Sequence, residues 1–437
     1  MNTSLLTLPQ DAARRLLTSL RKPTRFLAAV SGGSDSTGLL IALHRAVSQH
    51  DCPHSIAAAT VDHALRPEST AEARTVASLC ASLDIPHRIV TWQGDKPSTG
   101  ISAAARQARY RLLSTAADEL GATAMVTGHT ADDQYETIAM RAARATQDNL
   151  GLSGMAAATL YDRRIWVLRP FLAVRRAAIR DYLSEAGIGW VDDPSNVDPH
   201  YERVRIRLGH GARPSTPENN AAERRRELSS AAASLVGRCA TLHAGCLVSL
   251  SADARNAAPQ VLRHTLATLA TIAGGRTYRP SAAAMDQLMQ LVASGSPGRM
   301  TLSGALVQLR RDDIYIMREV RDVLPRDVAA QSSLLWDGRY LITNPSDDRF
   351  HVHPDAATFA PPASDTLSPA MLRHIGRITP EIRFHSGSAD KGAPPPDTVS
   401  ITPAFPLFDH FLPDFDLPLA EAIARLFGRK AYLPLPA

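Results

Sequence analysis

Residues 25–36 read RFLAAVSGGSDS, and this stretch decides the fold of the first part of the chain. The apolar run 25–30 predicts a short buried strand, and leucines at helical spacing after Ser36 predict a helix. A Gly-Gly turn between them lets the backbone approach a ligand closely, because no Cβ intervenes. The N–H groups of the turn and of the helix start then form an anion site, which predicts nucleotide binding. The structural alternative is a Gly-Gly turn in which Asp35 caps the helix.

The composition is that of a globular protein, and the length of 437 residues predicts two or three domains. The formal net charge of +5 permits an anionic partner. The four cysteines form no C-x-x-C pair, which favours reduced thiols over a disulfide framework. No apolar run approaches the ~20 residues that a membrane span needs. With no secretory signal visible, we expect a cytoplasmic protein without a membrane partner.

Strands and helices alternate along the first half of the chain, which predicts an α/β fold with a doubly wound parallel sheet. Further strands are expected at 55–61, 88–92, 122–126 and 165–171, and helices at 5–20, 73–83, 101–120 and 174–186. Ligands of such sheets bind beyond the carboxyl ends of the strands. Polar clusters at 31–36, 62–66 and 128–137 each follow a strand, so we expect them to share one site.

The chain is expected to contain a catalytic domain at 1–210 and two smaller regions after it. Residues 211–325 predict a helical domain with a hairpin, and residues 326–437 predict a small, Pro-rich α+β region whose role is not legible. Within them we expect helices at 221–250 and 281–293, a hairpin at 300–319, a strand at 334–343, and a Pro-rich tail from about 344.

Acidic side chains crowd residues 128–137, GHTADDQYET, which open a helix after the fourth strand. Asp132 and Asp133 precede Glu136 by four and three residues, so the carboxylates share a helix face. Acids in a first turn also offset the helix dipole, but that explains only one or two of them. With His129 beside them, a functional site is favoured. Carboxylates near a phosphate loop can hold Mg²⁺, and one can take a proton from an attacking amine.

The phosphate loop is similar to that of the ATP pyrophosphatases, the PP-loop superfamily. Together with VDHALR at 61–66 and the acidic motif, in this order and spacing, it resembles the tRNA(Ile)-lysidine synthetase family. Shorter motifs at 105–111, 169–172 and 193–196 agree, and the resemblance covers about residues 24–207. It implies a ligase that uses ATP and Mg²⁺ to adenylate C2 of the wobble cytidine of tRNA(Ile) with a CAU anticodon. Free L-lysine then displaces AMP and forms lysidine.

The resemblance also implies roles for the residues at matching positions. The nucleotide is expected at Ser31, Gly32, Gly33, Ser34, Asp35, Ser36, Asp62, His63 and Arg66. Catalysis is expected from Asp35, His129, Asp132, Asp133 and Glu136, with Asp35 as the Mg²⁺ ligand. Contacts to tRNA are expected from the helical domain at 211–325 and from Arg109, Arg111, Arg144, Arg203, Arg205 and Arg207.

Two positions depart from the pattern of that family. Residues 145–150 lack the glycines that usually follow Arg144, and Val204 stands where an asparagine is typical. A tRNA thiolase of the same superfamily is the alternative enzyme, although no cysteine lies near the motifs with suitable spacing. The alternative from another class is a nucleotide-responsive RNA-binding protein without catalysis. Both a monomer and a homodimer are compatible with the sequence.

Overall fold

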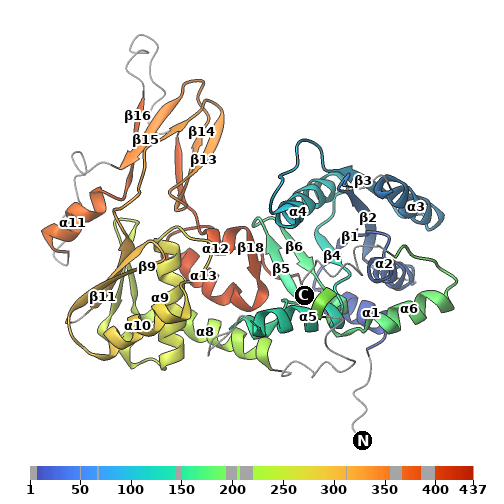
Figure 1. The fold of residues 1–437 in the computed structure, drawn as a ribbon, viewed down its shortest axis with the longest axis horizontal. Coiled ribbons are helices and arrows are strands. Elements are labelled where there is room, and N and C mark those ends of the chain that lie inside the picture. Colours follow the sequence, from blue (N-terminus) through green and yellow to red (C-terminus); the bar gives the residue numbers. More distant parts are fainter. Residues whose placement is uncertain are drawn as a thin grey trace, which may run out of the picture. The chain divides into compact units, whose positions relative to one another are not determined.

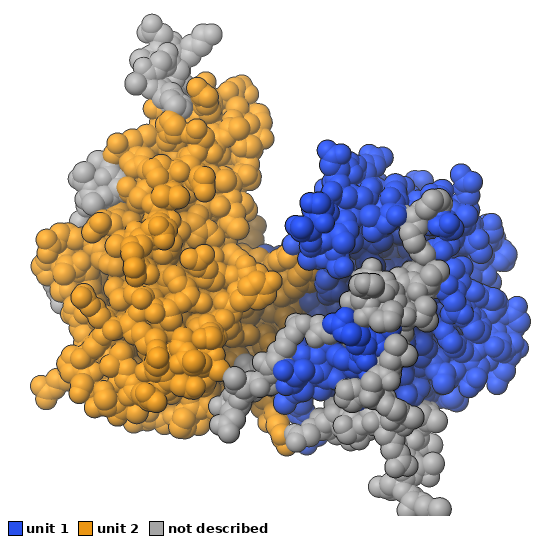
Figure 2. Space-filling model, in the orientation of Figure 1, with its two compact units in different colours: residues 1–223, 433–437 blue, residues 224–432 orange. Residues whose placement is uncertain are grey.

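The computed structural model describes residues 7–49, 51–65, 68–143, 150–192, 204–206, 220–311, 313–354, 367–384 and 399–436. The chain divides into two compact units, which Figure 2 shows in different colours. Unit 1 comprises residues 1–223 and 433–437, and unit 2 comprises residues 224–432. The predicted boundary at residue 211 lies outside the described residues. Unit 2 spans both regions expected beyond that boundary, and their division at residue 326 stays a prediction.

Unit 1 is built on a mostly parallel sheet, whose strands within this unit lie in the order β5-β6-β4-β1-β2-β3. Their bounds are β1 Arg25–Ala29, β2 Ser55–Asp62, β3 His87–Thr91, β4 Ala124–Thr127, β5 Ala158–Tyr161 and β6 Ile165–Leu168. β1 is parallel to both of its neighbours, β2 and β4. The predicted parallel sheet is confirmed. β5, which is absent from the predicted strands, runs antiparallel to β6.

The helices of unit 1 cover both faces of this sheet. Their bounds are α1 Pro9–Ser19, α2 Ser34–Val47, α3 Ser69–Ser82, α4 Ile101–Glu119, α5 Ala131–Ala142 and α6 Arg176–Glu185. Parallel crossovers are right-handed, so α2 and α3, which step along the sheet in one direction, lie on one side of it, and α4 lies on the other (Figure 1). The strands are added outward from β1 to β3, and β4 is then added on the other side of β1, so the direction of winding changes between β1 and β4. The carboxyl ends of these two strands form the topological switch point, where ligands of such sheets bind.

The centre of unit 1 is apolar because its sheet is covered on both faces. Phe26 and Leu27 of β1 and Leu40 of α2 are fully buried. Gly38 is required in α2, since a Cβ there would lie 2.3 Å from Cγ2 of Ile179 in α6. This close packing near the starts of both helices places the N-terminus of α6 beside that of α2.

Unit 2 contains most of α8 (Ala221–Cys239), followed by β7 (Ala240–His243) and β8 (Leu247–Ser251). The predicted helix over 221–250 is therefore wrong beyond Cys239. Ala244 and Gly245 adopt positive φ values of 47° and 68°, and the chain turns there into the antiparallel β7-β8 hairpin. The Ala- and Leu-rich composition continues through this turn, and Gly245 is the local signal that marks it.

The hairpin belongs to an antiparallel sheet of order β7-β8-β11-β10-β9. Its other strands and the two helices beside it are α9 Pro259–Ala273, α10 Ala282–Ala293, β9 Gly298–Leu302, β10 Ala305–Leu309 and β11 Asp313–Arg318. The predicted helix at 281–293 is confirmed, and the predicted hairpin at 300–319 is part of a three-strand meander.

The last part of unit 2 has more regular structure than its proline content predicts. Its elements are β12 Arg326–Val328, β13 Ser332–Trp336, β14 Tyr340–Asn344, β15 Phe350–Pro354, α11 Pro369–Gly376, β16 Pro380–Phe384, β17 Ser400–Pro403, α12 Pro406–Asp409, β18 Phe411–Pro413 and α13 Leu417–Leu426. The single strand predicted at 334–343 is a pair of antiparallel strands. Prolines in the first turns of α11, α12 and α13 cost no hydrogen bond, because the first N–H groups of a helix have no partner within it.

Across the described parts of the chain, no helix is both long and apolar enough to span a bilayer.

Candidate active site

The phosphate loop, residues 31–36, joins β1 to α2 at the switch point of the sheet. Gly32 has a φ of +87°, a conformation that glycine adopts without strain. The Ser36 hydroxyl accepts the Ser31 N–H at 3.1 Å and donates to the Gly33 carbonyl at 3.2 Å. Ser36 therefore holds the loop closed from within. The first N–H groups of α2 have no acceptor within the helix, so a phosphate at this corner would satisfy them.

The acidic motif begins α5 directly beside this loop. A capping box starts the helix: the Thr130 hydroxyl accepts the Asp133 N–H, and the Asp133 carboxylate accepts the Thr130 N–H at 2.8 Å. A Cβ on Gly128 would lie 2.7 Å from the carbonyl oxygen of Asp35. Glycine at this position therefore lets the segment after β4 touch the loop after β1, and two of the three predicted polar clusters meet.

Two arginines at the start of α6 bind the carboxylates of these clusters. Arg176 donates from Nε to Asp35 Oδ2 at 2.8 Å and from Nη2 to Asp133 Oδ1 at 3.2 Å. Its backbone N–H donates to Asp132 Oδ2 at 2.8 Å, and Arg175 Nη2 donates to Asp132 Oδ1 at 3.1 Å. Asp132 therefore caps α6, whereas Asp35 and Asp133 share one guanidinium.

Although they share one guanidinium, the two carboxylates have opposite pKa shifts. Burial raises the pKa of Asp35, and the charge of Arg176 only partly opposes it. Burial acts on Asp133 in the same sense, but the Thr130 hydrogen bonds, Arg176 and the nearby His129 outweigh it and lower its pKa. If Arg176 withdraws, Asp35 is the carboxylate that most needs a replacement cation.

His129 and Glu136 complete the predicted catalytic set on this side of the sheet. His129 Nδ1 lies 2.9 Å from the Thr127 hydroxyl at the end of β4. The Glu136 side chain is buried, one turn further along α5 than Asp132 and Asp133, and its negative charge acts on Arg176. All five predicted catalytic residues therefore lie around the N-termini of α2, α5 and α6.

The third predicted cluster makes its contacts elsewhere. Both oxygens of Asp62 are occupied: Oδ1 accepts the Ala64 N–H at 2.8 Å and the Ser69 hydroxyl at 2.7 Å, and Oδ2 accepts Thr70 at 2.8 Å. Asp62 thus ties the end of β2 to the start of α3. Burial and then the charge of Arg109 on α4 lower the pKa of His63 to about 4. The imidazole is therefore neutral near pH 7.

The predicted tRNA-contacting arginines are only partly placed. Arg109 and Arg111 are exposed on α4, where the charge of Arg109 acts on His63 and that of Arg111 on Tyr161. Arg205 is exposed on the short helical segment 204–206. The remaining predicted residues, Arg66, Arg144, Arg203 and Arg207, lie outside the described residues, as does the segment 145–149 that lacks the expected glycines.

Comparison with known proteins decides which kind of PP-loop protein this is. Residues 7–210 match the PP-loop domain family. A tRNA(Ile)-lysidine synthase from Rhizobium meliloti (strain 1021) is 42% identical, over 98% of this chain and 96% of its own. The chain belongs to the tRNA(Ile)-lysidine synthase family. A second member, from Mesorhizobium japonicum, is 38% identical over 98% of this chain and 97% of its own. A solved U34-tRNA thiolase from Methanococcus maripaludis covers 45% of this chain and 69% of its own, at 15% identity and a TM-score of 0.38, a likeness too low to bear on function.

Membership of the tRNA(Ile)-lysidine synthase family confirms the resemblance drawn from the motifs, the α/β fold and the use of ATP. The roles of individual residues stay predictions. The sequence analysis did not predict Arg175 and Arg176. These two arginines bind the carboxylates of the site. Cations oppose the dipole at a helix N-terminus, so two arginines in that position were a signal that carboxylates lie opposite them.

Gln134 is another residue whose contacts the sequence did not predict. Its side-chain amide donates to the Met155 carbonyl at 3.1 Å and accepts the Met155 N–H. Arg141 donates to the Gly154 carbonyl at 2.7 Å. These contacts fasten residues 154 and 155 to α5.

The donor set at the switch point fits a magnesium ion held jointly with a nucleotide. Among the described residues there is no group of three or more His, Cys, Asp or Glu side chains that could hold a metal alone. Magnesium at nucleotide sites is usually held by one or two carboxylates together with phosphates. Asp35 and Asp133 lie beside the phosphate loop and already share a cation, the Arg176 guanidinium. Asp35, the predicted Mg²⁺ ligand, is the residue that would hold the ion, which would supply charge neutralisation when bound.

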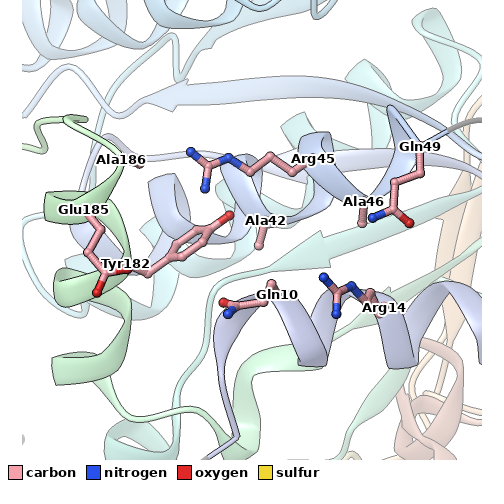
Figure 3. Close-up of a pocket in the computed structure, with 9 residues that line it drawn as sticks. All are labelled: Gln10, Arg14, Ala42, Arg45, Ala46, Gln49, Tyr182, Glu185 and Ala186. Atoms are coloured by element: carbon pink, nitrogen blue, oxygen red, sulfur yellow. The ribbon is translucent and has the colours of Figure 1, made fainter.

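A separate hollow of about 370 Å³ lies among α1, α2 and α6 (Figure 3). Arg45 of α2 stacks over the ring of Tyr182 of α6, 5.1 Å from its centroid, and Gln10 and Arg14 of α1 border the same space. None of the predicted site residues that the structure describes lines this hollow, so it is distinct from the candidate active site.

Proposed function

We propose that this chain joins L-lysine to C2 of the wobble cytidine of tRNA(Ile) with a CAU anticodon, forming lysidine. ATP first adenylates the cytidine and releases pyrophosphate, and the lysine ε-amine then displaces AMP. The names of relatives that align along almost the whole chain support the reaction and the tRNA. The observation that carries the chemistry is the pair Asp35 and Asp133, held around one cation beside a phosphate loop.

The phosphate loop is proposed to bind the ATP triphosphate. The N-terminus of α2 and the hydroxyls of Ser31 and Ser34 offer hydrogen-bond donors there. Adenylation develops negative charge on the departing pyrophosphate, so fixed donors at that position lower the barrier. Mg²⁺ held at Asp35 adds neutralising charge at the same place.

The carboxylates of α5 are proposed to receive lysine. The ε-ammonium of lysine must lose a proton before it can attack, and a carboxylate nearby can accept it. Asp133 and Glu136 lie on one face of α5, and Asp133 already binds a guanidinium at 3.2 Å. Asp132 has a different proposed role: both of its oxygens bind the start of α6, so it positions Arg176.

Arg176 is proposed to stand in for the cation when ligands are absent. It pairs with Asp35 and Asp133 at the position that both Mg²⁺ and the lysine ammonium require. The Arg176 side chain is partly exposed, and an arginine side chain is long and flexible. The guanidinium can therefore move aside at modest cost. The same movement would leave the guanidinium available to a phosphate.

Thiolation, the alternative chemistry within the superfamily, generally needs a reactive cysteine. Burial raises the pKa of both Cys80 and Cys246 to about 11, and Cys239 is also buried. Thiolates of Cys80 and Cys246 are therefore scarce near pH 7, which supports the ligase over the thiolase.

One assay tests the proposal. The protein is incubated with ATP, Mg²⁺, L-lysine and a tRNA(Ile) transcript with either a CAU or a UAU anticodon. We expect lysine-dependent pyrophosphate release and incorporation of labelled lysine with the CAU form alone. Incorporation of sulfur from a sulfide donor, or tRNA binding without pyrophosphate release, would instead favour the thiolase or the non-catalytic protein.

A further inference from the structure

One aromatic side chain on unit 2 is far more exposed than the others. Tyr278, in the loop between α9 and α10 (Figure 1), is 83% exposed. The other exposed large hydrophobic side chains among the described residues are at most 55% exposed, a value reached by Leu324. A lone exposed apolar residue is common on protein surfaces. The surroundings of Tyr278, a fixed loop and a hollow, are what point to a ligand.

The loop that carries Tyr278 is held at both ends. The Arg276 N–H donates to the Thr271 carbonyl of α9 at 3.0 Å. On the other side of Tyr278, the largely buried guanidinium of Arg279 lies 3.6 Å from the buried carboxylate of Asp416. An aromatic ring on a loop fixed in this way loses little conformational entropy when a ligand stacks on it.

Tyr278 also borders a hollow of about 690 Å³ between the loop, the start of α10 and β9. Apolar side chains, Met300 and Leu302, contribute to its lining, and polar ones, Arg276 and Gln287, lie among them. A ligand with flat apolar faces and a polar edge fits such a lining. A nucleobase has this character, and the volume is sufficient for one nucleotide.

Arg276 adds the charge that a nucleotide would need. Its side chain is exposed and, within the part of the chain that the structure describes, it takes part in no ion pair or side-chain hydrogen bond. Its guanidinium is thus available for a phosphate oxygen. An aromatic platform next to an arginine is the combination by which proteins bind single-stranded nucleic acid. Bases within a duplex are already stacked, so the fitting ligand is an unpaired nucleotide.

We propose that Tyr278 and Arg276 form a stacking site for one unpaired nucleotide of the bound tRNA. The base lies against the Tyr278 ring and the hollow, and the phosphate lies at Arg276. This inference rests on the proposed function, since it takes tRNA as the substrate. The site contributes affinity for tRNA and takes no part in the chemical steps.

The test measures the affinity of the full chain for a tRNA(Ile) transcript at several salt concentrations. Loss of base stacking in Tyr278→Ala is expected to weaken binding about tenfold. Tyr278→Phe and Tyr278→Trp are expected to stay within about twofold of the wild type, because they keep an aromatic face. Leu324→Ala is the matched control: it removes another exposed apolar side chain of unit 2 and is expected to have no effect.

Two further readouts separate stacking from charge and from general damage. Arg276→Ala is expected to reduce the slope of log K against log salt by about one, whereas Tyr278→Ala leaves that slope unchanged. Under saturating tRNA, Tyr278→Ala is expected to keep the wild-type kcat and to raise the KM for tRNA about tenfold. The added indole of Tyr278→Trp is expected to be quenched by tRNA and not by AMP.

Each outcome decides between the proposals. Binding by Tyr278→Ala within twofold of the wild type, or rescue by Tyr278→Leu, overturns the stacking site. Quenching of Tyr278→Trp by AMP alone assigns the hollow to a free nucleotide and also overturns it. If the wild type itself neither binds nor modifies tRNA(Ile), the proposed function fails. If the wild type does both and Tyr278→Ala is unimpaired, only this inference fails.

Discussion

Replacing Arg176 by glutamine removes the cation that Asp35 and Asp133 share. The three side chains retain 21%, 20% and 14% of their accessible surface, so they are mostly but not fully buried. Removing one partner of a fully buried ion pair costs 3–5 kcal/mol, and the remaining solvent access reduces the expected loss in the free energy of unfolding to about 2 kcal/mol. For a unit of this size that corresponds to a fall in melting temperature of about 6 °C.

The assay is thermal unfolding of Arg176→Gln and wild type, with and without Mg²⁺ and ATP. In the wild type the ligand must displace Arg176, whereas in the variant the carboxylates are already free of it. Mg²⁺ with ATP should therefore raise the melting temperature of the variant by more than that of the wild type, and the gap between them should narrow.

Arg180→Gln on the same helix is the matched control. Arg180 pairs with Asp192 at the surface, with 46% and 72% of the two side chains exposed, so the loss should stay below about 0.5 kcal/mol. Equal ligand-induced shifts in Arg176→Gln and wild type would refute the idea that Arg176 occupies the cation position.

Three other substitutions probe the site and the second unit. Asp35→Asn should keep the fold and abolish pyrophosphate release; turnover near the wild-type rate would contradict its role with the nucleotide. Gly128→Ala places a Cβ 2.7 Å from the Asp35 carbonyl oxygen, so melting temperature and ATP affinity should both fall, and an unchanged pair of values would show that the contact yields freely. In unit 2, burial and then the charge of Arg279 lower the pKa of His264 to about 3. The unfolded chain, with a pKa near 6.5, binds this proton first, so stability is full above pH 6.5 and falls by about 2 kcal/mol at pH 5. His264→Leu should remove that part of the pH dependence in urea titrations; equal slopes in variant and wild type would count against a buried neutral imidazole.

Much of the fold of unit 1 could be predicted from short segments, because its strands and helices depend on residues that are neighbours in the chain. The strand at Arg25–Ala29 follows from an apolar run, and the helix at Ser34–Val47 follows from apolar spacing after a Gly-Gly turn. The wrong prediction in unit 2 also came from considering only neighbours in the chain. The helix pattern beyond Ala221 continues in composition past Cys239, and only the turn at Gly245 and the pairing of β7 with β8 end it.

The sequence by itself determined which chemistry was present: a phosphate loop after one strand and a set of acids after another. Only the tertiary structure decided which groups those acids contact. Asp132 caps α6 and Asp133 shares Arg176 with Asp35, across separations of 44, 43 and 141 residues. Local spacing is set by helix and strand geometry, whereas such pairs depend on which N-termini the sheet order brings together. The reversal between β1 and β4, and the close approach of α6 to α2 at Gly38, are what place Arg176 between the two carboxylates.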